Sequence, residues 1–239
     1  REQELEIERH KQFHVDKMGA IGHMAAGLVH ELGNPVAAIL GLTHECQESL
    51  SEAGVEMQPV RDNLAMIIDY TERLSRINED MAAFHRPHQS TDWMDLNELV
   101  VRVDNLLHYD ERWYGIALDK QLEPQLPAIR GDSDQLSQLL MNLVVNAFEA
   151  IERVRPERPR VLIETSRADA GVLLRVIDNG CGLTPEQQQR AFEAFYTTKH
   201  EKGSGLGLLL CSSIVSGHDG YIRLLPNKSQ GLCVEVYLP

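Results

Sequence analysis

The protein is an acidic chain of 239 residues, in which 36 Asp and Glu outnumber 23 Lys and Arg and give a net charge of -13. This balance argues against binding to nucleic acid or to anionic lipid, and no apolar run reaches the roughly 18 residues that a membrane span needs. With 43% hydrophobic and 25% charged residues, the composition is that of a folded protein rather than a disordered one.

The N-terminal segment predicts a helix that continues from an upstream part of a longer protein. The chain begins at Arg1, and REQELEIERHKQF has the pattern of the middle of a charged helix, with no signal-peptide pattern. We therefore expect residues 1–17 to be an incoming signalling helix, connected to an upstream sensor region. Whether that region anchors the parent protein in a membrane stays open.

Residues 18–88 predict a helical hairpin. Two heptad seams of apolar residues are separated by a turn that contains Gly54 and Pro59. Because a lone hairpin buries too little apolar surface, we expect two copies to pair as a dimeric four-helix bundle, so that the protein is a homodimer. The first seam comprises Ile21, Ala25, Leu28, Leu32, Pro35, Ile39, Leu42 and Cys46, and the second comprises Val60, Leu64, Ile67, Thr71, Leu74, Asn78 and Met81.

Residues 92–239 predict a second domain, an α+β sandwich, because strands and helices alternate without regular βαβ units. A cap at Asp92 or Asp95 would begin its first helix. The expected helices run from that cap to 107, over 132–151 and over 206–216, with a loop over 191–205. The expected strands cover 115–122, 161–167, 172–179, 221–225 and 233–238.

One histidine lies opposite the first seam. With Ala25 and Leu28 at heptad positions a and d, His30 falls at position f and faces solvent. Most exposed histidines on helices have no chemical role, and His23 and His44, which also fall at f, are interpreted in that way.

The neighbours of His30 distinguish it from the other histidines. Glu31 can orient the imidazole or accept its proton, which leaves the other ring nitrogen as a neutral nucleophile. Asn34 lies one turn further along the same face. Gly33 and Pro35 weaken the helix beside His30, which suits a residue that meets more than one partner.

Two amides lie one turn apart on an otherwise apolar helix, at Asn142 and Asn146. Buried amides need hydrogen-bond partners, and bonds to a neighbouring loop would satisfy them. An asparagine oxygen is also a good ligand for Mg²⁺, which takes few protein oxygens and leaves its other positions to phosphate and water. The pair alone does not separate these two interpretations.

Two glycine-containing segments follow this helix. DNGCGL, from Asp178 to Leu183, is either a plain turn or a carboxylate that accepts a hydrogen bond from an adenine amino group. KGSGLGLLL, over 202–210, opens a helix with glycines whose free N–H groups suit phosphate oxygens. It is neither a Walker loop nor a dinucleotide-binding GxGxxG motif.

The segment HMAAGLVHELGNPVAAILG resembles the phosphoacceptor box of bacterial sensor histidine kinases. By this resemblance, His30 is the phosphorylated residue and Glu31 is its assisting base. Asn34 is the residue used when such an enzyme dephosphorylates its partner.

The Asn-containing helix, DNGCGL, FEAFYTTK and GSGLGL follow one another as in the ATP-binding domain of the gyrase, heat-shock chaperone, histidine kinase and mismatch-repair superfamily. This resemblance implies ATP and Mg²⁺ as cofactors, with Asn146 as the metal ligand, Asn142 on the phosphate side and Asp178 as the adenine reader. It also implies a lid anchored by Phe192 and Phe195. The other implied nucleotide contacts are Gly180, Gly182, Lys199, Gly203, Gly205 and Gly207.

The short lid and its TTK are most similar to sensor kinases of the nitrogen-regulation type. One departure is GHDG, where members of the family carry another glycine at the position of Asp219, and we expect only an altered turn there. The remaining histidines, His218 among them, are expected to be ordinary surface or loop residues.

The sequence thus predicts an ATP-dependent protein histidine kinase that phosphorylates His30 and passes the phosphoryl group to an aspartate on the receiver domain of a response regulator, with a regulator phosphatase activity. Two alternatives are a non-catalytic scaffold that binds nucleotide and a protein that acts mainly as a phosphatase. The presence of the acceptor, metal-ligand and glycine positions argues against the scaffold. Four widely spaced cysteines indicate neither a zinc site nor a disulfide framework and fit a cytoplasmic location.

Overall fold

The chain divides into two compact units, residues 1–86 with 194–206 and residues 87–193 with 207–239, and each is described by itself. The structure is a computed structural model. It describes residues 36–37, 39–48, 61–62, 64–69, 71–72, 74–75, 91–108, 113–168, 170–194, 196–199, 205–227 and 230–239. The predicted signalling helix over 1–17 and the residues His30, Glu31 and Asn34 lie outside the described residues.

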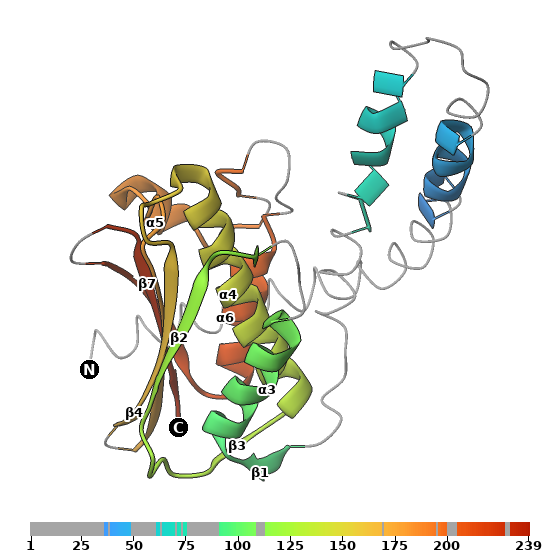
Figure 1. Cartoon of the computed structure of the whole chain (residues 1–239). Coiled ribbons are helices and arrows are strands. Elements are labelled where there is room, and N and C mark those ends of the chain that lie inside the picture. The colour runs from blue at the N-terminus through green and yellow to red at the C-terminus, as the bar shows by residue number, and fades with distance from the viewer. Residues whose placement is uncertain are drawn as a thin grey trace. The chain divides into compact units, whose positions relative to one another are not determined.

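Helical segments make up most of the described part of the first unit, within 36–48 and 61–75, drawn in blue and cyan in Figure 1. Large apolar side chains on both segments are exposed, including Ile39 at 46%, Leu42 at 62% and Leu74 at 48%. These three residues belong to the two predicted heptad seams. Their exposure in a single copy leaves an apolar surface of the kind that pairs with another.

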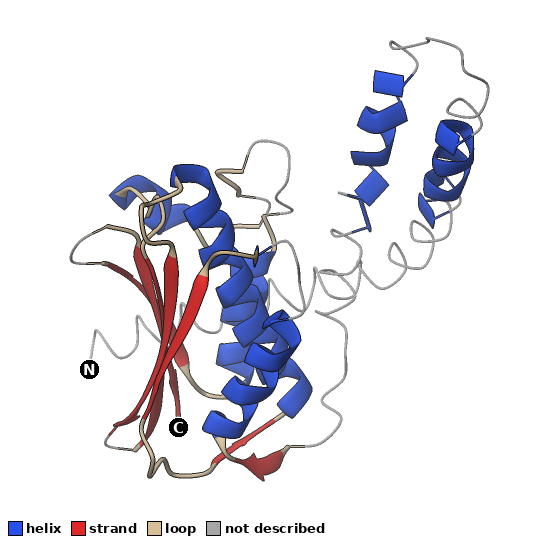
Figure 2. Ribbon diagram, viewed as in Figure 1, coloured by secondary structure: helices blue, strands red, loops and turns tan. Residues whose placement is uncertain are grey.

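The second unit contains the described strands and helices from residue 92 onward. Three of its helices, α3, α4 and α6, cover one face of its large sheet (Figures 1 and 2). In chain order the elements are β1 (Asp92–Met94), α3 (Leu96–His108), β2 (Ala117–Leu122), β3 (Ile129–Gly131), α4 (Ser133–Val154), β4 (Arg160–Ala168), β5 (Gly171–Asp178), α5 (Pro185–Arg190), α6 (Gly207–Gly217), β6 (Tyr221–Pro226) and β7 (Leu232–Leu238).

The large sheet has the strand order β2-β4-β5-β7-β6, while β1 and β3 pair separately as an antiparallel ribbon. Strands β2 and β4 run parallel, and the other neighbours run antiparallel. The sequence predicted no regular βαβ unit, yet β2 and β4 are parallel and the chain between them passes through α4. Two parallel strands need a crossover connection between them, and here α4 supplies it and packs on the sheet, in contact with β4 and β5.

The core lies between the sheet and α4. On β5, Val172, Leu174 and Val176 are buried and alternate with half-buried residues, as expected for a strand with one face toward helices. On α4, Leu140 and Leu143 are almost completely buried on the face that meets the sheet and the neighbouring helices. Each such side chain contributes about 1.5–3 kcal/mol by leaving water.

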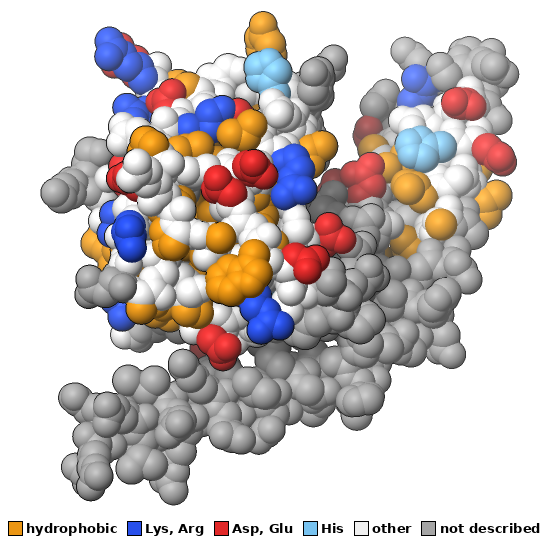
Figure 3. Space-filling model, turned by 90° about the horizontal axis from the view of Figure 1, so that it is seen from below, with side chains coloured by type: hydrophobic (Ala, Val, Ile, Leu, Met, Phe, Trp, Pro, Cys, Tyr) orange, Lys and Arg blue, Asp and Glu red, His pale blue; other side chains and the backbone are white. Residues whose placement is uncertain are grey.

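Charged side chains on the sheet pair across neighbouring strands. Arg175 on β5 lies 2.9 Å from Glu235 on β7 and 4.0 Å from Glu164 on β4, and the three residues are direct cross-strand neighbours. On the face drawn in Figure 3, acidic and basic side chains are interspersed with hydrophobic ones. Local pairing of this kind offsets part of the repulsion that an excess of acidic residues creates.

In the second unit, the predicted long elements are confirmed, with boundaries shifted by one or two residues at most positions. Of the two caps considered for the first helix, Asp95 holds that place, because its Oδ1 accepts the N–H of Asn97 at 2.8 Å. Asp92 instead begins β1. Strands β1 and β3 and helix α5 were not predicted, although α5 carries a capping box between Thr184 and Gln187.

His218 lies in the turn that follows α6, as a loop residue would, but it is buried, so its assignment as an ordinary surface residue was wrong. Its Nδ1 lies 2.7 Å from the carbonyl oxygen of Ile214, and its Nε2 accepts the backbone N–H of Asp132 at 3.0 Å. Nδ1 therefore carries the hydrogen and the ring is neutral. Asp132 is the N-cap of α4, with Oδ1 accepting from Asp134 and Gln135. His218 thus ties the end of α6 to the start of α4.

The His218→Ala substitution is expected to lower the free energy of unfolding by about 1–3 kcal/mol, because it leaves the buried N–H of Asp132 without its acceptor. The measurement is the urea midpoint of the full chain. Ser216→Ala, at an exposed position near the end of α6, serves as the control and should change stability by no more than about 0.5 kcal/mol. Equal effects of the two substitutions would show that the bond to Asp132 contributes nothing.

Candidate functional site

Asp178 ends β5 and is buried, with 4% of its surface exposed. Its Oδ1 accepts the backbone N–H of Gly180 at 2.8 Å and that of Leu232 at 3.3 Å. Within the described part of the chain, no hydrogen bond reaches Oδ2. One oxygen of this carboxylate is therefore held by the protein, and the other is available to accept a hydrogen bond from a ligand.

Burial raises the pKa of Asp178 above its ordinary value of 3.8, because the charged form is poorly solvated there. The N–H groups of Gly180 and Leu232 act in the opposite direction, with a smaller effect. A buried carboxylate whose protonation is shifted by desolvation is typical of a functional site.

Gly180 is required by a close approach between the DNGCGL turn and the end of α4. A Cβ at Gly180 would lie 2.5 Å from the carbonyl carbon of Ala150 and 2.7 Å from its oxygen. The N–H of Cys181 donates to that same oxygen at 3.1 Å. The resemblance implies that Gly180 contacts the nucleotide, and this role stays a prediction, whereas the structure shows its packing against the backbone of α4.

Gly182 has a positive φ of 65°, and a Cβ there would lie 3.0 Å from the carbonyl oxygen of Gly231. DNGCGL therefore lies between two neighbours, the last turn of α4 at Gly180 and the turn between β6 and β7 at Gly182. Both contacts are made by backbone atoms, which explains why larger side chains do not fit.

Asn142 and Asn146 lie on α4, as predicted. The Nδ2 atom of Asn142 is buried and has no hydrogen-bond partner within the described part of the chain. A buried donor without an acceptor costs free energy in the free protein, and an anionic oxygen from a ligand would satisfy it.

The start of α6 lies beside Asn146. A Cβ built at Gly207, the first residue of α6, would lie 3.8 Å from Nδ2 of Asn146. The first turn of a helix presents free N–H groups and the positive end of the helix dipole. The structure thus brings together Asn146 and one glycine of the predicted phosphate loop, and together they offer a place for an anionic ligand.

Residues 194–206 belong to the first unit, so the predicted lid is described only by its internal contacts. The N–H of Lys199 donates to Oγ1 of Thr197 at 3.0 Å, and Gly205 has a positive φ of 70°. Phe192 is half-buried. Phe195 and Gly203 lie outside the described residues, and the roles predicted for these lid positions stay predictions.

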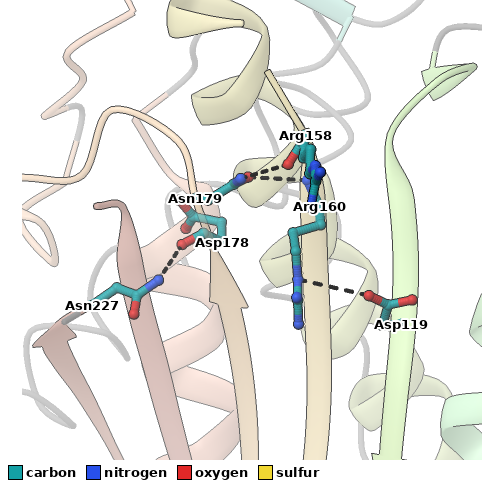
Figure 4. A network of polar contacts seen from close by, with 6 residues as sticks. All are labelled: Asp119, Arg158, Arg160, Asp178, Asn179 and Asn227. Atoms are coloured by element: carbon teal, nitrogen blue, oxygen red, sulfur yellow. Dashed lines mark hydrogen bonds and ion pairs between the residues drawn. The ribbon is translucent and has the colours of Figure 1, made fainter. Parts of the chain in front are cut away.

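Two asparagines next to Asp178 were not among the predicted site residues (Figure 4). Nδ2 of Asn179 donates to the carbonyl oxygen of Arg158 at 2.7 Å, and its Oδ1 accepts the N–H of Arg160 at 3.0 Å. Nδ2 of Asn227 donates to the carbonyl oxygen of Asp178 at 2.9 Å. The available signal was Asn at the ends of strands, a residue that commonly bonds to nearby backbone in turns.

No group of three or more His, Cys, Asp or Glu side chains that could hold a metal ion occurs among the described residues. A divalent cation bound mainly by phosphate and water needs few protein oxygens, and the amide oxygen of Asn146 has the chemistry for one. Among the helices that the structure describes, none combines the length and apolar character needed to cross a bilayer.

Two family models match the chain. The His Kinase A (phospho-acceptor) domain matches residues 20–90. The histidine kinase-, DNA gyrase B-, and HSP90-like ATPase matches residues 131–239, which include every described residue of the site around Asp178.

The similar proteins match most of this chain and are longer than it. The sensor histidine kinase ZraS of Escherichia coli (strain K12) is 33% identical over 225 residues, which cover 94% of this chain and 46% of ZraS. Full-length ShkA, solved in complex with AMPPNP, has a TM-score of 0.68 at 26% identity, covering 91% of this chain and 45% of ShkA. ThkA in complex with the response regulator protein TrrA has a TM-score of 0.66 at 23% identity, covering 99% of this chain and 66% of that chain. That likeness shows the fold alone, and this chain spans about half the length of the curated relatives it matches.

Gly180→Ala is expected to destabilise the second unit by about 1–3 kcal/mol, because the added methyl group would lie 2.5 Å from the backbone of Ala150. Thermal unfolding of the full chain measures the loss. Gly41→Ala is the matched control, because a Cβ at this helical glycine meets nothing within 4 Å. That control should gain about 0.5–1 kcal/mol from helix propensity, and a comparable gain at Gly180 would contradict the close approach.

Asp178→Asn is expected to raise the free energy of unfolding at neutral pH, since burial of the charged carboxylate opposes folding. The folded-state pKa is raised, so between 3.8 and that value the native state binds more protons than the unfolded state. Wild-type stability therefore falls as the pH rises through this window, and the advantage of the variant shrinks on acidification. Urea unfolding of wild type and variant at neutral and at acidic pH measures this difference in the free energy of unfolding.

Asp119→Asn is the control for this pH dependence, because its side chain is 54% exposed and makes only a surface ion pair with Arg160 at 3.7 Å. Its effect should stay within about 0.5 kcal/mol at neutral pH. An Asp178→Asn variant that is no more stable than wild type at neutral pH would show that the bonds to Oδ1 outweigh the cost of burial.

Proposed function

The chain belongs to the two-component sensor histidine kinases, and from that membership we propose that it is an ATP-dependent protein histidine kinase that phosphorylates itself at His30. The observation that carries the proposal is the arrangement around Asp178. A buried carboxylate with one free oxygen lies in the same unit as a buried amide donor at Asn142 and the start of α6 beside Asn146. His30 lies in the phospho-acceptor match.

The nucleotide is held by groups that complement its two ends. Oδ2 of Asp178 accepts a hydrogen bond from the exocyclic amine of adenine. Nδ2 of Asn142 donates to a phosphate oxygen, and the N–H groups in the first turn of α6 bind the phosphates. Lys199 is a further proposed contact to the phosphates. The amide oxygen of Asn146 would hold Mg²⁺, which would supply neutralisation of phosphate charge.

In the phosphoryl transfer, a ring nitrogen of His30 attacks the γ-phosphorus of ATP in line with the bond to the leaving oxygen. The N–P bond forms as the P–O bond breaks, and ADP leaves with the bonding electron pair. Glu31 accepts the proton from the other ring nitrogen or orients that nitrogen. Positioning and charge neutralisation supply most of the rate acceleration in such reactions.

The acting form is a homodimer. Exposed seam residues such as Ile39, Leu42 and Leu74 support this proposal, because pairing with a second copy would remove their apolar surface from water. In domain terms, residues 1–17 form the signalling helix, 18–88 the dimerisation and phosphotransfer domain, and 92–239 the ATP-binding domain.

The phosphoryl group passes from His30 to an aspartate on the receiver domain of a response regulator, and Asn34 serves the reverse, dephosphorylating activity. An upstream sensor region governs the balance between the two. The short lid supports assignment to the nitrogen-regulation-like type. The catalytic part acts in the cytoplasm, where ATP is present.

Incubation of the chain with γ-labelled ATP and Mg²⁺ should label it with an acid-labile, alkali-stable phosphate. His30→Gln should abolish the label while nucleotide binding persists, because it removes only the acceptor nitrogen. His44→Gln, at an exposed position of the described helix over 39–48, should label as wild type does. A label that survives in His30→Gln, or one that resists acid, would refute the proposal.

A further inference from the structure

We propose that Asn227, Gln230 and Gly231, the described residues between β6 and β7 (the β6–β7 turn), are the second half of the adenine-recognition site. In this site Asn227 is a positioning residue that sets the carboxylate of Asp178 and thereby determines base specificity. This inference rests on the proposed function, because it takes Asp178 as the residue that binds adenine. It concerns a segment of the chain far in sequence from DNGCGL.

Asn227 bonds to both sides of this junction. Its Nδ2 donates to the carbonyl oxygen of Asp178 at 2.9 Å (Figure 4). The same Nδ2 donates to the carbonyl oxygen of Gln230 at 2.9 Å. Its backbone N–H donates to the carbonyl oxygen of Gly231 at 3.4 Å. One amide group therefore closes the turn and fastens it to the end of β5.

The same turn holds the Asp178 side chain directly. The N–H of Leu232 donates to Oδ1 at 3.3 Å. At Gly231, which has a φ of 99°, a Cβ would lie 2.1 Å from the carbonyl oxygen of Asp178 and 2.7 Å from Oδ1. The turn thus lies against Asp178, and a shift of the turn moves the N–H that orients its carboxylate.

The orientation of this carboxylate decides which base can bind. With Oδ1 held by two N–H groups, Oδ2 remains as an acceptor for a ligand donor. Adenine presents an amino group at its six-position, whereas guanine presents a carbonyl oxygen, which a carboxylate repels. Discrimination of this kind is large only when the buried group is fixed in place. Loss of the Asn227 tether should therefore weaken specificity as well as affinity.

Asn179 provides a matched control on the other flank. It also makes two side-chain hydrogen bonds to backbone, at 2.7 Å to Arg158 and at 3.0 Å from Arg160, and it too is half-buried. Neither bond reaches Asp178 (Figure 4). Replacement of Asn179 removes a similar amount of hydrogen bonding without releasing the β6–β7 turn.

The test is displacement of a fluorescent ATP analogue from the full chain by ATP and by GTP. Asn227→Ala should weaken ATP binding about 5- to 30-fold and GTP binding much less, so the preference for ATP shrinks. In autophosphorylation, the KM for ATP should rise while kcat at saturating ATP changes little. Asn179→Ala should keep the wild-type ratio of ATP to GTP affinity.

Two further variants separate positioning from loss of folding. Asn227→Asp keeps the size of the side chain but replaces the donor with an oxygen that repels the carbonyl of Asp178. Its preference for ATP over GTP should therefore fall at least as much as that of Asn227→Ala. In the Asp178→Asn background, Asn227→Ala should have no further effect on the preference, because the group that it positions is gone.

An unchanged ratio of ATP to GTP affinity in folded Asn227→Ala or Asn227→Asp, or equal loss in Asn179→Ala, would overturn the inference. The binding readout does not involve His30. Failure of wild type to bind ATP would refute the proposed function itself, whereas normal wild-type binding with unaltered variants would refute the role of Asn227 alone.

Discussion

The burial of one face of α4 is the constraint on which the site depends. Leu140 and Leu143 fix that helix against the sheet and its neighbouring helices. Asn142 and Asn146 lie at the border of this buried face, half-buried, and their orientation follows from the packing of the leucines. The last turn of α4 also supplies the carbonyl oxygen of Ala150 that holds the DNGCGL turn. One packed helix therefore positions both the amide pair and the turn that follows Asp178. Polar groups on separate elements are for this reason held at fixed positions relative to one another.

Helix α6 is held against α4 at both of its ends. At its start, Gly207 lies beside Asn146, and beyond its last turn His218 accepts the N–H of the α4 cap residue Asp132. The two helices thus run antiparallel, with an anion-binding helix start at one end and a hydrogen-bonded tie at the other. Because a helix is stiff, the tie at His218 restricts movement of the start of α6 along α4. A buried neutral histidine far from the ligand therefore contributes to the geometry of the phosphate side.

The sequence predicts the parts of this fold that have a strong period and misses those that depend on contacts between distant residues. The apolar period of α4 and the β-branched runs of β4 and β5 are long enough to define their elements and the position of Asp178. Strands β1 and β3 have three residues each, too few for a period, and pair only with one another. The bond between Asn227 and Asp178 spans 49 positions of sequence, and nothing local in the turn indicates its partner. Likewise, nothing near His218 in the sequence indicates its hydrogen bond to the backbone of Asp132, which lies 86 positions away.

Burial of Asp178 lowers the stability of the folded protein at neutral pH but provides an acceptor for a ligand. Its carboxylate is buried, which raises its pKa and opposes folding at neutral pH, and two backbone N–H groups compensate for this only in part. A protein selected for stability alone would fill this position with an apolar or amide side chain. The surrounding backbone instead leaves one oxygen free, and three elements enclose it: the end of β5, the last turn of α4 and the β6–β7 turn. Close backbone approaches restrict Gly180, Gly182 and Gly231, and the side chain of Asn227 fastens the β6–β7 turn to Asp178, so the local sequence is constrained at the positions that hold the carboxylate. The cost of burying the charge is then offset when a ligand donor reaches the free oxygen.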